Sequence, residues 1–178
     1  RGDRPNLPPV IPYSRYIQWL EARDSGESKR FWQDYLSGYG RAVVIPETSF
    51  LRKDAEDRHE ETSFEIEADM VASLQGLAAH HNVTLNTVVQ SVLAVLLSRY
   101  NNVPDVVFGA VVSGRTHEVA GIERMVGNFI NTIPVRIKPR ADMTVQDLLQ
   151  EAQKDALACE PYHYYPLNRI LSLSSLKQ

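Results

Sequence analysis

The chain has 178 residues, a formal net charge of −3 at pH 7 and 43% hydrophobic residues, which is ordinary for one globular domain. Its 19 basic residues are scattered among 22 acidic ones, so no basic patch indicates a nucleic-acid or anionic-membrane partner. Cys159 is the only cysteine, which excludes an internal disulfide and a multi-thiolate metal site, and without a signal peptide or a membrane-length apolar stretch we expect a cytoplasmic protein.

The N-terminal third is predicted to hold a linker, two helices and a strand. Residues 1–12 are rich in proline and read as a linker, which leaves 13–178 for the folded domain. Ser14 is expected to cap a short helix, and a second helix is expected to end at Gly38. Alternating apolar and polar residues over 61–67 predict a strand half exposed to water.

Two helices and a strand are predicted in the middle of the chain. Asp69 is a candidate N-cap for a helix that ends at Asn82, a residue type that tolerates the left-handed conformation. Apolar residues recur at helical spacing over 84–100, so this helix should be central. The continuous apolar run over 106–112 predicts a strand covered on both faces.

The C-terminal third is predicted to hold a second strand and two more helices. Residues 128–138 alternate, and Pro134 places this strand at an edge or at a bulge. Thr144 and Asp147 fit a capping box, and a short final helix follows Pro166. Helices that alternate with so few strands indicate an α/β sandwich with a mixed, incomplete sheet, and therefore an apolar edge or face left open.

The histidines and serines carry no clear catalytic pattern. His80 and His81 fall at the C-terminal end of a predicted helix, where the macrodipole favours such side chains, and no acidic residue or cysteine lies at metal-ligand spacing. His163 belongs to the aromatic run Y-H-Y-Y-P, which either packs or lines a ligand channel. Ser113 lacks the G-x-S-x-G context of a nucleophile, and the nearby glycines fit neither phosphate-loop spacing.

The segment over 112–136 is the best site candidate on physical grounds. It combines Ser113, Gly114 and Arg115 with Asn131, a polar side chain on the apolar face of a strand, which costs stability unless it finds a partner. The alternative interpretation is a strand-turn-strand connection in which the glycines serve backbone geometry alone.

Four motifs resemble one family. V-S-G-R followed by M-V-G-N-F-I-N-T-I-P-V-R is similar to the signature of condensation domains of nonribosomal peptide synthetases. Further agreement lies in Y-I-Q-W-L-E-A-R-D with F-W-Q-D-Y-L-S-G, in T-L-N-T-V-V-Q-S-V-L-A-V-L-L-S-R-Y and in H-Y-Y-P-L-N-R-I. The resemblance implies two lobes similar to chloramphenicol acetyltransferase, of which this chain is a large part of the second, C-terminal lobe.

The family's activity is peptide-bond formation between thioesters carried on the phosphopantetheine arms of carrier proteins, in the biosynthesis of secondary metabolites. The resemblance implies as partners the N-terminal lobe, peptidyl carrier proteins and an adjacent adenylation domain, with no cofactor bound directly. The family's catalytic H-H-x-x-x-D-G motif is missing, since Leu85 and Asn86 occupy its Asp and Gly places after His80-His81. We therefore expect no catalytic residue in this chain, and no condensation by the chain alone.

By position, the resemblance assigns Ser113 to the tunnel near the partner lobe's histidine and Asn131 to the tunnel wall. Gly114 and Gly127 would allow close backbone approach, and Arg136 would be a structural ion-pair member. The complete set of expected substrate-tunnel residues is Ser113, Gly114, Arg115, Gly127, Phe129, Asn131, Thr132 and His163.

Three other functions are compatible with the sequence. The chain is alternatively a non-catalytic module that docks carrier proteins or neighbouring domains, or a lobe of an epimerisation domain, although N-T-I-P-V-R fits the condensation form better. A free-standing acyltransferase is a third alternative, which an assay with soluble thioesters would reveal.

Overall fold

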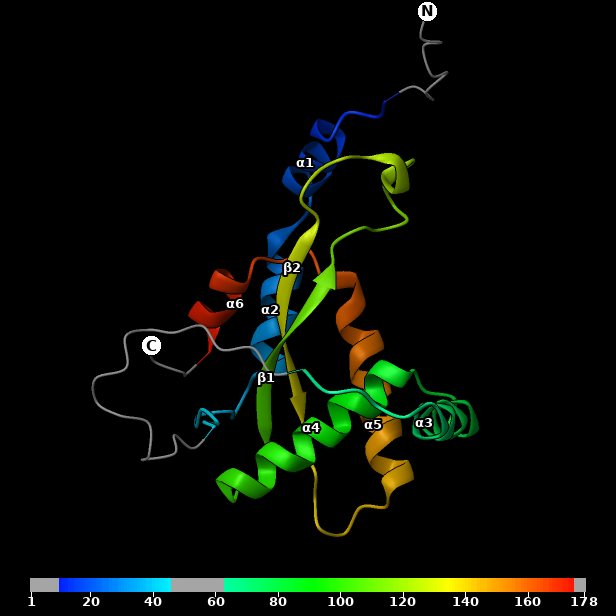
Figure 1. Ribbon diagram of the computed structural model, residues 1–178. Helices are drawn as coiled ribbons and strands as arrows, with labels where there is room; N and C mark the ends of the chain where they lie inside the picture. The colour runs from blue at the N-terminus through cyan, green and yellow to red at the C-terminus, as the bar shows by residue number, and fades with distance from the viewer. Residues whose placement is uncertain (1–9, 46–62, 175–178) are drawn as a thin grey trace, which may run out of the picture. The chain divides into compact units, whose positions relative to one another are not determined.

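The computed structural model describes residues 10–45 and 63–174 and is drawn as a ribbon in Figure 1. The chain divides into two compact units, the first made of residues 1–38, 109–134 and 161–178, the second of residues 39–108 and 135–160. Each unit is held by its own contacts and is described by itself.

The first unit contains helices α1 (Ser14–Glu21), α2 (Ser25–Tyr35) and α6 (Leu167–Leu173) and the 3-10 helix η1 (Ile122–Arg124). Asp24 begins α2 by accepting a hydrogen bond from the backbone N–H of Gly26, and Gly38 follows the helix with a φ of +73°. Helix α2 packs against α6, with Trp32 fully buried. A separate apolar cluster gathers five buried residues, Tyr16, Val119, Ile122, Met125 and Phe129.

The second unit contains helices α3 (Ala68–His80), α4 (Leu85–Asn101) and α5 (Val145–Cys159), and the 3-10 helix η2 (Glu160–Tyr162) begins at its last residue. Helix α4 packs against both α3 and α5. Thr84 caps α4, and the expected capping box of Thr144 and Asp147 is confirmed at the start of α5. The main core cluster of the second unit comprises Ala94, Leu97, Val106, Ile137 and Ala152.

The sheet of the described residues has two strands, β1 (Val106–Ser113) and β2 (Ile130–Ile137), which run antiparallel in Figure 1. The expected α/β class and the incomplete sheet are confirmed for the described residues. The expectation that β1 is covered on both faces is wrong, because Val111 is 72% exposed. Exposed residues alternate with half-buried ones over the second half of β1, at Gly109, Val111 and Ser113, so one face of this strand is open to solvent.

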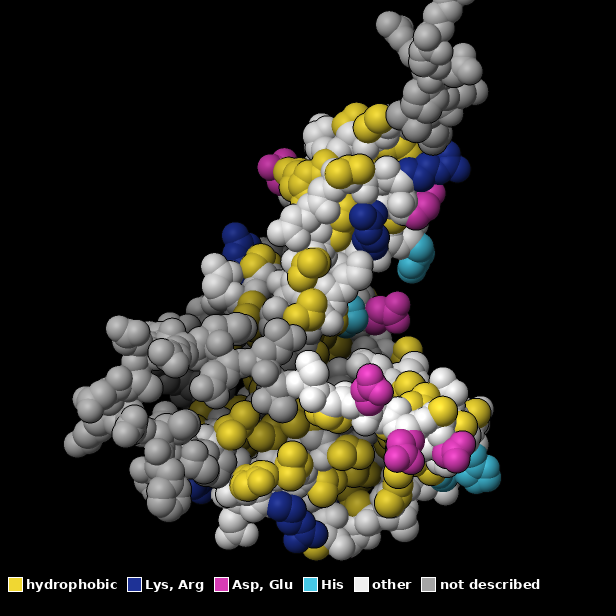
Figure 2. Space-filling view, in the orientation of Figure 1, with side chains coloured by type: hydrophobic (Ala, Val, Ile, Leu, Met, Phe, Trp, Pro, Cys, Tyr) yellow, Lys and Arg dark blue, Asp and Glu magenta, His cyan; other side chains and the backbone are white. Residues whose placement is uncertain are grey.

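The open apolar surface expected from the sequence is found on helix α4. Its inner positions, Val88, Ala94 and Leu97, are buried, whereas its outer positions are exposed, and Val92 reaches 62%. Figure 2 shows hydrophobic side chains gathered over this helix. The exposed apolar residues of α4 are Leu85, Val89, Val92, Leu93, Val95, Leu96 and Tyr100.

Three local predictions are wrong. Ser14 is the first residue of α1 and not its cap, since Tyr13 takes the N-cap position without a side-chain cap bond. Asp69 lies within the first turn of α3, after an N-cap at Glu67. Residues 63–67 form no strand, and Phe64 is 81% exposed. No strand among the described residues pairs with this stretch, and residues 61 and 62 lie outside the described part.

Candidate functional site

The segment that joins β1 to β2, residues 114–129, is called the glycine loop here because Gly114, Gly121 and Gly127 punctuate it. The backbone N–H of Gly114 donates to the carbonyl oxygen of Phe129 at 2.6 Å, which extends the pairing of the two strands to the base of the loop. Gly121 has a φ of +76°, a conformation that glycine adopts without strain. The ends of the loop are therefore held together by the main chain.

Arg115 holds the interior of the glycine loop. Its guanidinium donates to the carbonyl oxygens of Ile122 and, at 3.0 Å, of Met125. The same group lies 4.0 Å from the ring centroid of Phe129, a cation–π contact. The loop has no strand ladder of its own, so these bonds give its backbone carbonyls the partners they need.

The glycines at the loop ends face aromatic side chains from the N-terminal segment. A Cβ added at Gly114 would lie 2.7 Å from the hydroxyl of Tyr16, and one at Gly127 would lie 2.2 Å from the ring of Tyr13. Real Cβ atoms do not approach other atoms so closely, so both positions need glycine. The close approach in this structure comes from the chain's own tyrosines.

Asn131, the second residue of β2, ties the strand to the segment before α6. Its side-chain Nδ2 donates to the carbonyl oxygen of His163 at 2.7 Å and to that of Tyr165 at 2.8 Å. Both amide hydrogens are thereby used, which fixes the orientation of the half-buried side chain. Its Oδ1 accepts no hydrogen bond from the described residues and is left as a fixed acceptor.

The segment over 160–166 is anchored by stacked rings and tyrosine hydroxyls. Tyr162 stacks on Phe31 with ring centroids 4.2 Å apart, and its hydroxyl donates to Glu27 at 2.9 Å, a bond that raises the pKa of the tyrosine. The hydroxyls of Tyr164 and Ser28 lie 2.7 Å apart. These contacts fix the backbone carbonyls that Asn131 binds.

The remaining expected tunnel residues lie along the strands. Ser113 is exposed at the end of β1, and its hydroxyl accepts from the backbone N–H of Arg115 at 3.3 Å. Thr132 follows Asn131 directly and so lies on the other face of β2, where its methyl approaches Gly109. The structure thus gathers Ser113 and the loop residues at the strand ends and joins Asn131 to His163, while Thr132 faces away from Asn131.

Arg136 makes an ion pair within the second unit. Its Nε donates to Oδ1 of Asp105 at 3.0 Å and its Nη2 to Oδ2 at 2.6 Å, and the arginine is only 8% exposed. The guanidinium also lies 5.6 Å from the ring of Tyr39, whose pKa burial raises. Asp105 and Tyr39 were not predicted from the sequence as partners of Arg136. The position of Asp105 directly before the predicted strand over 106–112, which pairs with the strand of Arg136, could have indicated it.

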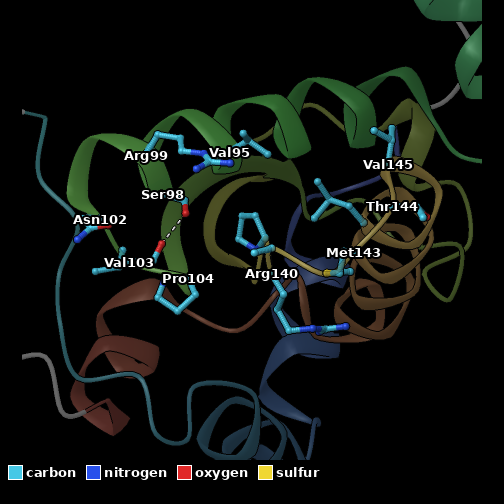
Figure 3. A pocket seen from close by; sticks show the side chains of 13 residues that line it. Val95, Ser98, Arg99, Asn102, Val103, Pro104, Arg140, Met143, Thr144 and Val145 are labelled. Atoms are coloured by element: carbon cyan, nitrogen blue, oxygen red, sulfur yellow. Dashed lines mark hydrogen bonds between the residues drawn. The ribbon is translucent and has the colours of Figure 1, made fainter.

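A cavity in the second unit was not foreseen from the sequence. It has a volume of about 580 Å³ and lies between the C-terminal half of α4 and the start of α5. Figure 3 shows Arg99 and Ser98 on one side and Met143 and Thr144 on the other. Its lining has arginines and hydroxyls but no histidine, cysteine or carboxylate, so the described groups supply no general base.

Residues 10–45 and 63–174 contain neither a cluster of metal ligands nor a single membrane-spanning helix. Within these ranges no three histidine, cysteine, aspartate or glutamate side chains cluster as metal ligands. No single helix there has both the length and the apolar character to cross a bilayer; α3 and α4 reach that length only as a pair bent by 101°.

Helices and a two-stranded β ladder, with a glycine loop between the strands, place the described residues in the α/β class. The chain belongs to the condensation domain family, since the family model described as "Condensation domain" matches residues 1–178.

Similar proteins include nonribosomal peptide synthetases. Bacitracin synthase 3 of Bacillus licheniformis is 44% identical over 177 residues, which are 99% of this chain and 3% of that protein. Tyrocidine synthase 2 of Brevibacillus parabrevis is 40% identical over 175 residues, 97% of this chain and 5% of that protein. The chain therefore spans less than a tenth of the length of these relatives.

Among solved structures, the X-domain from teicoplanin biosynthesis superposes with a TM-score of 0.69 at 23% sequence identity, over 93% of this chain and 37% of that chain. At this identity the match shows a shared fold. Because the match covers only 37% of that chain, the residues of this chain correspond to part of that fold.

Proposed function

We propose that this chain is a large part of the C-terminal lobe of a condensation domain that forms peptide bonds between carrier-bound thioesters. In this proposal the lobe forms the tunnel wall on the acceptor side. One observation carries the proposal: Asn131, inside the family's signature strand, has both amide hydrogens bound to main-chain carbonyls and its Oδ1 left as an oriented acceptor.

The chemistry explains why an oriented acceptor is useful. The acceptor amine attacks the thioester carbonyl carbon, a C–N bond forms, the C–S bond breaks, and the amine proton ends on the thiol. Such a reaction needs positioning and hydrogen bonds more than a strong nucleophile. Asn131 Oδ1 would accept an N–H of the pantetheine arm or of the acceptor amine, and Ser113 would line the tunnel mouth.

The proton must be handled by a group outside this chain. No H-H-x-x-x-D-G motif occurs in the sequence, and His80 and His81 contact each other at the end of α3. We therefore propose that the N-terminal lobe supplies the imidazole and that this chain alone is inactive. Carrier proteins with phosphopantetheine arms and an adenylation domain, all in the cytoplasm, complete the proposed setting.

The test replaces Asn131 in the complete condensation domain. Asn131→Ala removes donors and acceptor, and Asn131→Asp keeps an acceptor but loses the donors. Both variants should lose about 1–2 kcal/mol of stability because the carbonyls of His163 and Tyr165 lose their partners. A domain that is stable by about 5–15 kcal/mol stays folded after such a loss, so a fall in product rate of about 100-fold for Asn131→Ala reports on positioning.

The comparison between the two variants decides the role of Oδ1. Asn131→Asp should retain more activity than Asn131→Ala at equal or lower stability, as measured by product formation from loaded carriers and by urea unfolding. Ser73→Ala on the exposed surface of α3 serves as the control and should change neither quantity. Equal fractional losses of rate and of folded protein in both Asn131 variants would refute a tunnel role and favour a docking module without chemistry.

A further inference from the structure

Tyr13 joins the N-terminal segment to the end of the glycine loop. It occupies the N-cap position of α1, and its hydroxyl donates to the carbonyl oxygen of Asn128 at 2.5 Å. Its ring meets Phe129 edge-on, with centroids 5.1 Å apart. The two residues that hydrogen-bond here are 115 positions apart in sequence, so this contact is tertiary and not a consequence of a local turn.

The ring of Tyr13 also fills the space that a side chain at residue 127 would need. A Cβ at Gly127 would lie 2.2 Å from Cδ2, 2.5 Å from Cε2 and 2.7 Å from Cγ of Tyr13. These are atoms of a ring held at both ends, by its backbone at the N-cap of α1 and by its hydroxyl on Asn128. A side chain at residue 127 is therefore possible only if the ring of Tyr13 moves or is removed.

The residues after Gly127 lead directly into β2. Asn128 accepts the backbone N–H of Ile130 on its side-chain Oδ1 at 3.0 Å, and Phe129 accepts the N–H of Gly114. Asn131 follows Ile130 directly. Tyr13 thus holds the main chain three residues before Asn131, at the point where the strand begins.

We propose that Tyr13 is a positioning residue for the candidate site: its hydroxyl and ring hold the turn over 127–129 and so set where β2 begins and where Asn131 presents its Oδ1. The proposal rests on the proposed function of Asn131. The competing interpretation is that Tyr13 only adds apolar area to the cluster around Tyr16. The two interpretations differ in what loss of the hydroxyl alone will do.

The first experiment is Tyr13→Phe in the complete condensation domain, with Tyr16→Phe as a matched control. The Tyr16 hydroxyl makes no hydrogen bond within the described residues, whereas that of Tyr13 holds Asn128. Hydrogen exchange at the amides of Gly114 and Ile130 should rise about fivefold in Tyr13→Phe, the effect of one lost hydrogen bond, and stay unchanged in Tyr16→Phe.

The kinetic readout separates positioning from packing. For Tyr13→Phe we expect kcat to fall about fivefold to tenfold with little change in KM and with a Tm within about 2 °C of the parent domain. A merely structural residue would change Tm without this split. If the exchange rates and kcat of Tyr13→Phe equal those of Tyr16→Phe, the proposal is overturned.

The second experiment tests the fit between ring and glycine by a double-mutant cycle. Gly127→Ala should lower Tm because its methyl clashes with the ring, and in a Tyr13→Ala background this loss should shrink to less than about half. It should not shrink in a Tyr13→Phe background, which keeps the ring. Gly76→Ala in α3, where a Cβ meets open space, is the control for the glycine substitution itself.

The outcomes of the cycle are distinct from a failure of the proposed function. Additive losses for Gly127→Ala and Tyr13→Ala overturn the contact between ring and glycine. An unchanged kcat for Tyr13→Phe, in a domain that Asn131→Ala slows, overturns the positioning role. If Asn131→Ala is itself not slow, the tunnel role of Asn131 fails, and the exchange rates and the cycle still decide whether Tyr13 holds the turn.

Discussion

The glycine loop in the first unit and the ion pair of Arg136 in the second unit differ in what their polar side chains bind. In the first unit, Tyr13, Arg115 and Asn131 all donate to main-chain carbonyls of irregular segments. In the second unit, Arg136 donates to the carboxylate of Asp105, and helices α3, α4 and α5 pack around apolar clusters. A loop without a ladder needs side chains to fix its backbone, so the polar residues of the glycine loop specify its geometry, whereas Arg136 mainly stabilises the strands it joins to Asp105.

The largest expected effect tests the stabilising role in the second unit. Arg136→Ala would leave Asp105 as a partly buried carboxylate without its bidentate partner, and breaking such a pair costs about 3 kcal/mol. Urea unfolding at neutral pH measures this loss. Arg124→Ala, at an exposed pair with Glu123, should cost less than about 0.5 kcal/mol, and equal costs for both arginines would contradict the comparison.

An intermediate effect is expected at the capping box of α5. Thr144→Ala removes the hydroxyl that accepts the N–H of Asp147 and should cost about 1 kcal/mol at pH 7. Hydrogen bonds from the side chain and backbone of Thr144 lower the pKa of Asp147 below its ordinary value of 3.8. A lowered pKa stabilises the fold above pH 3.8, and this contribution is lost as the pH falls through the folded-state pKa.

The difference in unfolding free energy between the parent chain and Thr144→Ala should therefore be largest above about pH 5 and shrink toward about pH 2. Urea titrations at several pH values measure it. A difference that stays constant over this range would show that the charge of Asp147 plays no part in the cap.

The smallest effect concerns the open face of α4. Val92→Thr, at an exposed position, should change the unfolding free energy of this chain by less than about 0.5 kcal/mol. The same substitution at buried Val88 on the same helix places a hydroxyl in the core and should cost about 1–3 kcal/mol. Similar costs at both positions would show that the apolar face of α4 is covered in solution.

Periodicity predicted the elements that tertiary contacts do not alter. The helix over 84–100, the stop at Asn82 and the cap at Thr144 follow from local chemistry, and the structure confirms them. The strand expected over 61–67 is not formed over residues 63–67, since strand pairing depends on a partner that the local pattern does not specify.

The candidate site shows the same limit. Motif and polarity selected Asn131 and the glycine loop, but the partners of Asn131 lie more than thirty positions away at His163 and Tyr165. Nothing in the local sequence indicates that Tyr13, at the edge of a predicted linker, fills the space over Gly127. Contacts between distant segments are fixed by the packed fold and leave no periodic signal.

The fit between the N-terminal segment and the glycine loop has a consequence for chimeric condensation domains. Ile11 and Tyr13 contact Gly121 and Gly127 across more than a hundred residues. A crossover point placed between these segments would combine Ile11 and Tyr13 from one parent with the glycine loop of the other parent. An exchange that takes both segments from a single parent preserves the packing of Ile11 and Tyr13 against the glycine loop.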